Sequence, residues 1–175
     1  LEALLTESDP YLEELLLMDE EFSSPLEVRF AFVTDESSTV FNSELLAAID
    51  DLRDSYSAIP FADRLTTILD YVSPETQSKL FIKNLLSYSE EELGEVADAA
   101  LADRLLTANL LSDDAALTFA IITMDSTGIS ADDRLDIATA ALALRDEIRN
   151  RHPDVQILAN SEVMLEQSSQ QAMVD

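Results

Sequence analysis

The order in which two periodicities follow one another restricts the fold more than any other feature of the sequence. Residues 26–33 alternate apolar side chains with other side chains, and this period of two is typical of a strand with one buried face. An apolar stripe with helical spacing follows at 42–56, and residues 64–72, rich in Leu, Thr, Ile and Tyr, predict a second strand. The sequence therefore predicts a strand–helix–strand unit over 25–74.

The same order returns in the C-terminal half. A nearly continuous apolar run at 117–124 predicts a central strand. Ser130 can cap a helix that ends before Pro153, and the acids of its first turn and the arginines of its last turn complement the backbone dipole. The inward face of this helix is predicted to consist of Leu135, Ala138, Leu142 and Ile148. Residues 155–159 predict a fourth strand, so a second unit is expected over 113–160.

Two further segments are predicted to be helical. The region 1–24 is predicted to contain an N-terminal helix, 10–21, in which a proline follows a capping aspartate. Between the two units a helical insertion is expected over 75–112, where Ser89 and Glu92 have the spacing of a capping box. The apolar stripe of this insertion is predicted to consist of Leu93, Val96, Ala97, Ala100, Leu101 and Leu105.

Two strand–helix–strand units in series leave few topologies open. Because such crossovers are right-handed, the two units are expected to interleave in one sheet. The predicted fold is α+β: a ferredoxin-like split β-α-β sandwich with a four-stranded antiparallel sheet, helices on one face and a helical insertion between the units. The chain contains only 2 Gly and no flexible linker, so we expect the units to share one core in a single domain, 1–175.

The charge of the chain restricts its partners. Its 36 acidic and 10 basic residues give a formal net charge of -26, which repels nucleic-acid phosphates and anionic lipid headgroups. An excess of this size hints at a saline or cation-rich medium outside the cell. The absence of Cys excludes thiol chemistry and disulfides, and no apolar run in the sequence is long enough for a membrane span.

The sequence contains few groups that indicate catalysis. His152 is the only histidine, and we interpret it as a turn residue at a helix end, because it has neither a second His nor a Cys with which to complete a metal site. Lys79 and Lys83 are the only lysines, and no glycine-rich phosphate loop or nucleophile elbow accompanies them. No catalytic or cofactor-binding residue is predicted, so we do not expect an enzyme.

Two groups of carboxylates each fall within one helical turn, where two of them could share a hard cation. These groups are Asp50, Asp51 and Asp54, and Asp132, Asp133 and Asp136. In a chain with 36 acidic residues such triplets arise by chance, and the pattern of a calcium loop is not met because its Gly is missing. We interpret both groups as solvated helix faces, with loose divalent binding as the alternative, and no metal site is predicted.

Several short stretches, taken in order, resemble the first large extracytoplasmic loop of RND-superfamily exporters, the group that includes the MMPL and Patched-like transporters. The stretches are 1–5, 9–22, 40–46, 59–68, 109–113, 118–122 and 153–157. Their order and spacing carry the resemblance, which covers nearly the whole chain. The family often has Gly after the proline that follows the first helix and after the last strand, where this chain has Phe61 and Asn160.

The resemblance implies a porter-type domain on the periplasmic or extracellular face of the cell membrane, between the first two membrane helices of a proton-driven exporter. Such a domain would contact hydrophobic or amphiphilic substrates and the rest of the transporter, including its second extracytoplasmic loop. It would leave proton transfer to membrane helices elsewhere. Residues 161–175 would then form a helix leading toward the second membrane span, and the chain, which starts at Leu1, would be a segment of a longer protein.

Two other classes of function are also compatible with the sequence. The first is a free-standing acidic extracellular or salt-adapted binding domain that recognises its ligand through the sheet. The second is a carboxylate-based hydrolase, in which burial raises the pKa of one acid. In each case we expect the isolated chain to be monomeric and not to bind nucleic acid.

Overall fold

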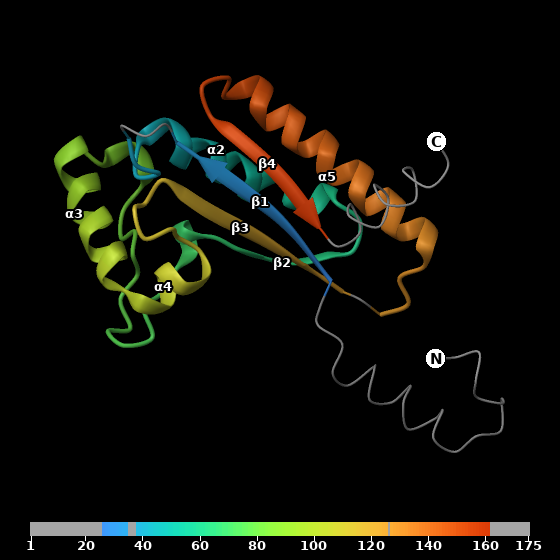
Figure 1. The fold of residues 1–175 in the computed structure, drawn as a ribbon, viewed down its shortest axis with the longest axis horizontal. Helices are drawn as coiled ribbons and strands as arrows, with labels where there is room; N and C mark the ends of the chain where they lie inside the picture. The colour runs from blue at the N-terminus through green and yellow to red at the C-terminus, as the bar shows by residue number, and fades with distance from the viewer. Residues whose placement is uncertain (1–25, 35–37, 126, 162–175) are drawn as a thin grey trace, which may run out of the picture.

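The structure is a computed structural model that describes residues 26–34, 38–125 and 127–161. Four strands form one antiparallel sheet in the order β2-β3-β1-β4, packed against helices (Figure 1). The strands are β1 (Glu27–Val33), β2 (Ala62–Thr66), β3 (Leu117–Met124) and β4 (Gln156–Ser161). The α-helices are α2 (Ser43–Ser55), α3 (Glu90–Ala102), α4 (Arg104–Asn109) and α5 (Ala131–Arg151). The predicted α+β fold with a four-stranded antiparallel sheet is thus confirmed, and the predicted helix 10–21 lies outside the described residues.

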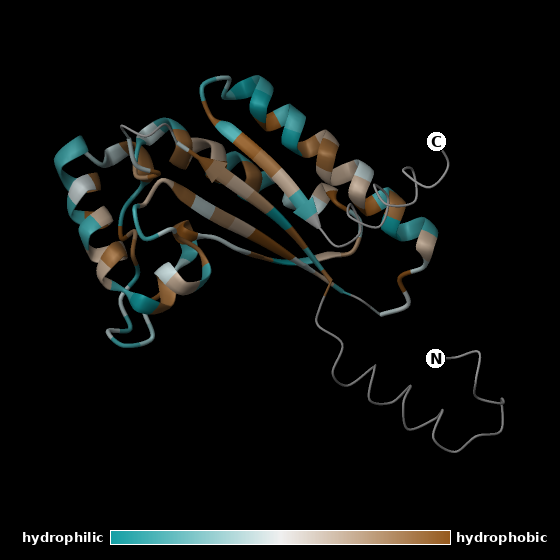
Figure 2. Cartoon of the chain, viewed as in Figure 1, coloured by the Kyte–Doolittle hydropathy of each residue, from teal (hydrophilic) through white to brown (hydrophobic). Residues whose placement is uncertain are grey.

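Alternation along β1 separates the two faces of the sheet. Val28, Phe30 and Phe32 are completely buried, whereas Arg29 between them is exposed. Phe30 pairs with Ala120 of β3 on one side and Ala159 of β4 on the other, so small neighbours leave room for its ring. The apolar strand residues are visible as a brown band in Figure 2. This period-two pattern is the reason why β1 could be predicted from the sequence.

The helices α2 and α5 connect β1 to β2 and β3 to β4, respectively, and their buried side chains belong to the same core. Asn42 caps α2 by accepting a hydrogen bond from the Leu45 amide. At the start of α5, Ser130 and Asp133 form a complete capping box. Both helices therefore begin at residues whose side chains satisfy free backbone amides.

The face that α5 buries was predicted only in part. Leu135 is 48% exposed and Leu142 is half-buried, whereas Ala138 and Ile148 are buried as expected. The buried side chains of the helix are Ile137, Ala138, Ala141, Leu144 and Ile148. Ala and Leu occur on more than one side of α5, so spacing alone does not select the inward face. The observed face carries three apolar side chains together with two alanines, which allow a close approach to the sheet.

The second predicted strand, 64–72, is shorter than expected. β2 ends at Thr66, and the next residues form a 3₁₀ turn, Ile68–Asp70. The hydroxyl of Thr67 accepts a hydrogen bond from the Leu69 amide at 3.1 Å, which caps this turn and replaces a continuing ladder. The apolar residues of the turn are buried nevertheless, so they belong to the core without being in a strand.

The predicted insertion 75–112 contains α3 and α4, and the Ser89–Glu92 capping box at the start of α3 is confirmed. However, residues 75–80, predicted to be helical, belong instead to a hairpin, 71–80: the Leu80 amide donates to the Tyr71 carbonyl at 3.0 Å. A 3₁₀ turn, Leu85–Ser87, precedes α3.

The apolar stripe predicted for the insertion is interrupted at one residue. Asp103 ends α3 and caps α4, so the helical register changes there. Leu105 is therefore 48% exposed, and Leu106 is buried in its place. Leu101 is also exposed, whereas Leu93 is buried as predicted.

The last strand extends further than predicted. β4 includes Asn160, which pairs with Arg29, and ends at Ser161. Ser161 therefore belongs to a strand and does not begin a helix, because β1 offers it a ladder partner in Val28. The helix predicted for the residues after it lies outside the described residues.

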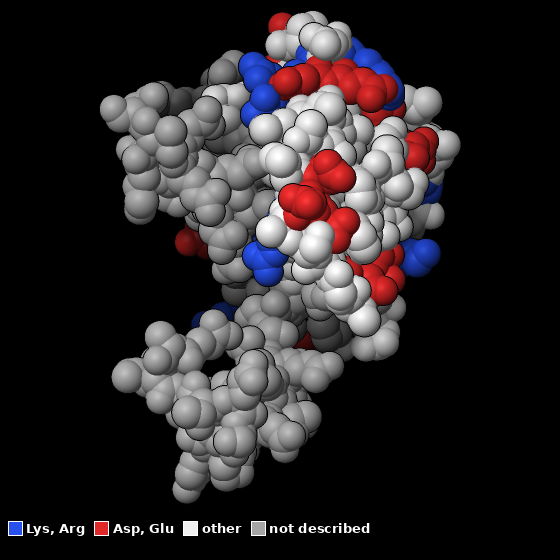
Figure 3. Space-filling model, turned by 90° about the vertical axis from the view of Figure 1, so that its right-hand side faces the viewer, with Lys and Arg blue, Asp and Glu red and all other residues white. Residues whose placement is uncertain are grey.

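Charged side chains on the described surface are interspersed. In the view of Figure 3, Asp and Glu side chains form separate groups, and basic side chains lie beside the uppermost group. Near the C-terminal end of α5, Arg145 lies 2.7 Å from Asp146, and Arg151 forms an ion pair with Glu147. The few basic residues thus neutralise part of the acidic excess locally, although exposed pairs of this kind add little stability.

Candidate functional site

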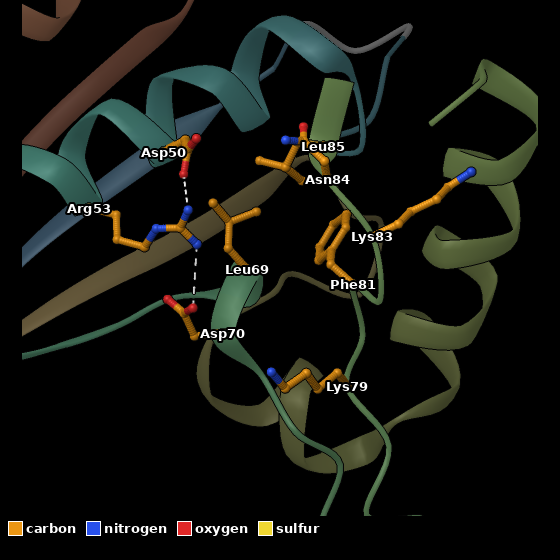
Figure 4. A pocket seen from close by; sticks show the side chains of 9 residues that line it. All are labelled: Asp50, Arg53, Leu69, Asp70, Lys79, Phe81, Lys83, Asn84 and Leu85. Atoms are coloured by element: carbon orange, nitrogen blue, oxygen red, sulfur yellow. Dashed lines mark hydrogen bonds and ion pairs between the residues drawn. The ribbon is translucent and has the colours of Figure 1, made fainter. Parts of the chain in front are cut away.

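The hairpin 71–80 and the residues that follow it lie between α2 and α3, and they form two pockets that share Lys79. The first, which we name the α2 pocket, has a volume of about 270 Å³ and is shown in Figure 4. Its lining consists of Asp50, Arg53, Leu69, Asp70, Lys79, Phe81, Lys83, Asn84 and Leu85. The second, which we name the α3 pocket, has a volume of about 320 Å³. Its lining consists of Tyr71, Ser73, Glu75, Thr76, Ser78, Lys79, Leu80, Ala99, Ala102, Asp103 and Leu106.

In the α2 pocket, Arg53 joins the helix α2 to the 3₁₀ turn after β2. Its guanidinium forms an ion pair with Asp50 one turn earlier and lies 3.4 Å from Asp70 Oδ1 (Figure 4). Thr67 Oγ1 lies 3.4 Å from the other oxygen of Asp70. The charge of Arg53 is therefore shared between two carboxylates, so this residue is a structural link more than a free binding group.

The two lysines of the α2 pocket differ in their surroundings. Lys83 Nζ lies 2.5 Å from Glu92 Oε1 and 4.6 Å from the centre of the Tyr88 ring, and its side chain points away from Arg53 (Figure 4). The hydrogen bond from Lys83, together with those from Ser89, lowers the pKa of Glu92 to about 2. Lys79 forms no ion pair with any residue in the described ranges. It is the more available cation of the two.

The α3 pocket contains a buried hydroxyl without a hydrogen bond. Tyr71 Oη is shielded from solvent, and no described residue offers it a partner at regular distance and angle. Burial, and then the nearby carboxylates of Asp103 and Glu75, raise the pKa of Tyr71 to about 12. Because no bond of regular geometry joins them, we treat Tyr71 and Asp103 as close neighbours and not as a bonded pair. Leaving such a hydroxyl unsatisfied costs roughly 1–3 kcal/mol, so it requires an explanation.

Asp103 is held in a fixed position in the wall of the same pocket. Its Oδ1 accepts hydrogen bonds from the amides of Leu105 at 3.0 Å and Leu106 at 3.2 Å, which caps α4. Burial alone would raise the pKa of Asp103, but the neighbouring Ser73 hydroxyl and the amides at the start of α4 lower it overall. This carboxylate therefore remains ionised beside the Tyr71 hydroxyl.

The remainder of the α3 pocket is largely apolar. Ala99 and Ala102 on α3, Leu106 on α4 and Leu80 on the hairpin provide this part of the wall. Such a combination of an apolar wall with a few polar groups is typical of sites that hold small organic molecules.

His152 lies at the C-terminal cap of α5, as the sequence predicts for a helix-end residue. Its Nε2 is 3.0 Å from Asp51 Oδ2 on α2, and Arg151 Nη1 is 3.2 Å from the same oxygen. The hydrogen bond with His152 lowers the pKa of Asp51, burial opposes this effect and Arg151 adds to it. The cluster joins two helices and is not part of either pocket.

The two carboxylate triplets do not converge on common points. Asp50 and Asp51 pair with different basic side chains, Arg53 and His152. In the second triplet, Asp133 accepts hydrogen bonds from the hydroxyl and the amide of Ser130, which complete the capping box. These bonds lower the pKa of Asp133, and the bond from the Ser130 hydroxyl has the larger effect. Within the described residues, no three His, Cys, Asp or Glu side chains are placed to hold a metal ion together.

Sequence reasoning missed the two residues that distinguish the α3 pocket. Tyr71 was assigned to a strand, and nothing in its local pattern indicates an unpaired hydroxyl. Asp103 gave a usable signal, because an aspartate followed by Arg104 and two leucines interrupts the apolar stripe in the way an N-cap does. The contact between the two residues is a product of the hairpin and could not be read from spacing.

Comparisons of the chain with protein-family models, with curated proteins and with solved structures found no match. In the part of the chain that the structure describes, no helix is both long enough and apolar enough to cross a membrane.

Proposed function

We propose that the chain is a porter-type extracytoplasmic domain of an RND-superfamily exporter, without catalytic activity, that contacts cargo and the rest of the transporter. The observation that carries this proposal is the sheet order β2-β3-β1-β4, with α2 and α5 each inside one strand–helix–strand unit. This order is that of a ferredoxin-like split β-α-β sandwich, with α3 and α4 inserted between the units. Modules of this kind are what the resemblance implies.

The backbone at Phe61 supports the same proposal. Phe61 follows Pro60 and has a φ of 62°, the left-handed conformation in which glycine is favoured. It stands at the position where the exporter family often has Gly. The backbone conformation thus agrees with the family pattern although the residue does not.

Two surface features suit contact with cargo and with other parts of a transporter. The α3 pocket combines an apolar wall with ionised and hydroxyl groups, which suits an amphiphilic molecule. On the turn before α3, Ile82 and Leu86 are 82% and 88% exposed. Apolar side chains in such positions are typical of surfaces that meet a partner, and we propose the remainder of the transporter as that partner.

The proposal is tested on the complete gene. We expect its reading frame to encode one membrane helix before Leu1 and another soon after Asp175. Because these 175 residues contain no Cys, a single cysteine at the exposed Ala58 would report topology in intact cells. Labelling of this cysteine by a membrane-impermeant maleimide supports the proposal, and labelling only after permeabilisation contradicts it.

The net charge of -26 favours a second candidate, a free-standing acidic binding domain in a saline medium. A reading frame close to 175 residues without flanking membrane helices would support this candidate and exclude the exporter domain. In both cases the chain acts by binding and not by catalysis.

A further inference from the structure

The α3 pocket contains groups that a positively charged ligand would satisfy. Tyr71 Oη is buried without a hydrogen bond, and an oxygen of this kind can accept from an ammonium group. Asp103 lies in the same wall, where the amides of Leu105 and Leu106 both donate to Oδ1. An N–H group bound against this wall, beside Asp103, would therefore be placed to give the hydroxyl the partner that the described residues do not provide.

The electrostatics of this pocket favour a cation. Its lining contains two carboxylates, Glu75 and Asp103, and one cation, Lys79, which it shares with the α2 pocket. The chain as a whole carries a formal charge of -26, so the long-range field draws cations toward such a hollow and repels anions. An anionic or neutral ligand would lack this attraction.

The size and the apolar wall restrict the ligand further. A volume of about 320 Å³ is at the lower end of the range for small-molecule sites. Ala99 and Ala102 provide a flat surface along α3, and Leu80 lies on the hairpin. These apolar side chains suit a ring or a short alkyl chain. Tyr71 and Asp103 belong to the lining of the same pocket.

We propose that the α3 pocket binds small primary amines, with the ammonium group against the wall formed by Asp103 and Tyr71 and the apolar part against Ala99, Ala102 and Leu80. The site would serve the cargo contact of the proposed function, but it is a property of this chain alone. Its failure would leave the exporter proposal intact, and the topology experiment would not affect it.

The head group is tested with three matched compounds and the 175-residue chain. 2-Phenylethylamine, 2-phenylethanol and 3-phenylpropanoate share a ring and a two-carbon linker and differ in charge. In calorimetric titrations at low salt we expect saturable 1:1 binding of the amine, weakened by added salt, and at least about tenfold weaker binding of the alcohol. Equal binding of all three compounds, or no saturable binding of the amine, overturns the proposal.

The location is tested with charge-matched variants. Asp103→Asn keeps an N-cap for α4, because Asn caps helices as well as Asp, and should weaken amine binding by about tenfold. Glu75→Gln, on the exposed hairpin, should weaken it less. Asp132→Asn removes the same charge from α5, outside the pocket, and should leave the affinity unchanged.

The remaining outcomes also decide the question. If Asp132→Asn weakens binding as much as Asp103→Asn, the amine follows only the overall field and the proposed site is wrong. Circular dichroism shows whether each variant is folded, and if Asp103→Asn is not, Glu75→Gln and Lys79→Gln replace it. Lys79→Gln removes the only cation of the lining and should tighten amine binding, so unchanged affinity in both replacements contradicts the proposal.

Discussion

His152 Nε2 lies 3.0 Å from Asp51 Oδ2, which joins the C-terminal cap of α5 to the middle of α2 across 101 residues of sequence. Arg151 reaches the same oxygen at 3.2 Å. The only histidine of the chain is therefore a link between the two helices that cover the sheet. This link gives His152 a structural role at the C-terminal end of α5.

Replacing Asp51 should destabilise the domain in a pH-dependent way. Because the folded pKa of Asp51 lies below its ordinary value of 3.8, its contribution is present above that value and is lost as the pH falls through the lowered pKa. For Asp51→Asn we expect a loss of about 0.5–1 kcal/mol of unfolding free energy near neutral pH, since the pair is partly exposed. Urea denaturation of both proteins from neutral pH downward should show the difference disappearing in acid.

A matched control removes the general effect of charge. Asp54→Asn takes the same charge from an exposed position of α2 and should leave the stability unchanged or raise it slightly, because it reduces self-repulsion. Equal losses in Asp51→Asn and Asp54→Asn would contradict a specific link to α5.

The left-handed backbone at Phe61 predicts that a Gly variant at this position is more stable to unfolding than an Ala variant. An L-residue in this conformation is strained by about 1–2 kcal/mol relative to Gly, and Phe61 has a φ of 62°. We therefore expect Phe61→Gly to unfold at higher denaturant than Phe61→Ala, by about 1 kcal/mol in free energy. Comparing these two variants cancels the loss of the ring, which is 41% exposed.

The same comparison at Ser57 serves as its control. Ser57 lies in the 3₁₀ turn Tyr56–Ala58, outside the positive-φ positions, so Ser57→Ala should be more stable there than Ser57→Gly. If Gly were also the worse residue at position 61, the turn would not be left-handed in solution.

The pair formed by Lys83 and Glu92 predicts a low pKa for this glutamate. The hydrogen bonds from Lys83 and Ser89 lower the pKa of Glu92 to about 2, so it should titrate well below its ordinary value of 4.5 in carboxyl-detected NMR. Its contribution to stability is present above the ordinary value of 4.5 and is lost as the pH falls toward 2. In Lys83→Met the pKa of Glu92 should rise, and an unchanged titration would show that the ion pair does not form.

Local sequence patterns predict the strands and helices that are determined by residues close together in the sequence. They do not predict the segments whose structure depends on a contact between distant residues. The alternation along β1 and the capping box of α3 depend on residues within a few positions of each other, and both are confirmed. Thr67 ends β2 through its own hydroxyl, a local competitor that the apolar pattern conceals. The predicted insertion has a hairpin because Tyr71 bonds to Leu80, a pairing that periodicity does not report.

The candidate site was hidden from the sequence for the same reason. Tyr71 and Asp103 come from separate segments, and only the hairpin brings them to one wall. The lysines were visible as the only two of the chain, but spacing could not show that Glu92 engages Lys83 and leaves Lys79 available. Pairings of this kind are tertiary, and a single sequence contains no direct record of them.

Tyr88 and Tyr71 predict opposite effects of the same substitution. Tyr88 Oη accepts hydrogen bonds from the amides of Ile82 at 2.9 Å and Lys83 at 3.3 Å, so Tyr88→Phe removes both bonds and should cost about 0.5–1.5 kcal/mol. Tyr71→Phe removes a buried hydroxyl that has no partner, so it should leave the unfolding free energy unchanged or raise it by up to about 1 kcal/mol. Denaturant titrations without ligand measure both. A loss in Tyr71→Phe as large as that in Tyr88→Phe would mean that Tyr71 donates to Asp103 in solution, and the hydroxyl would then be satisfied within the chain.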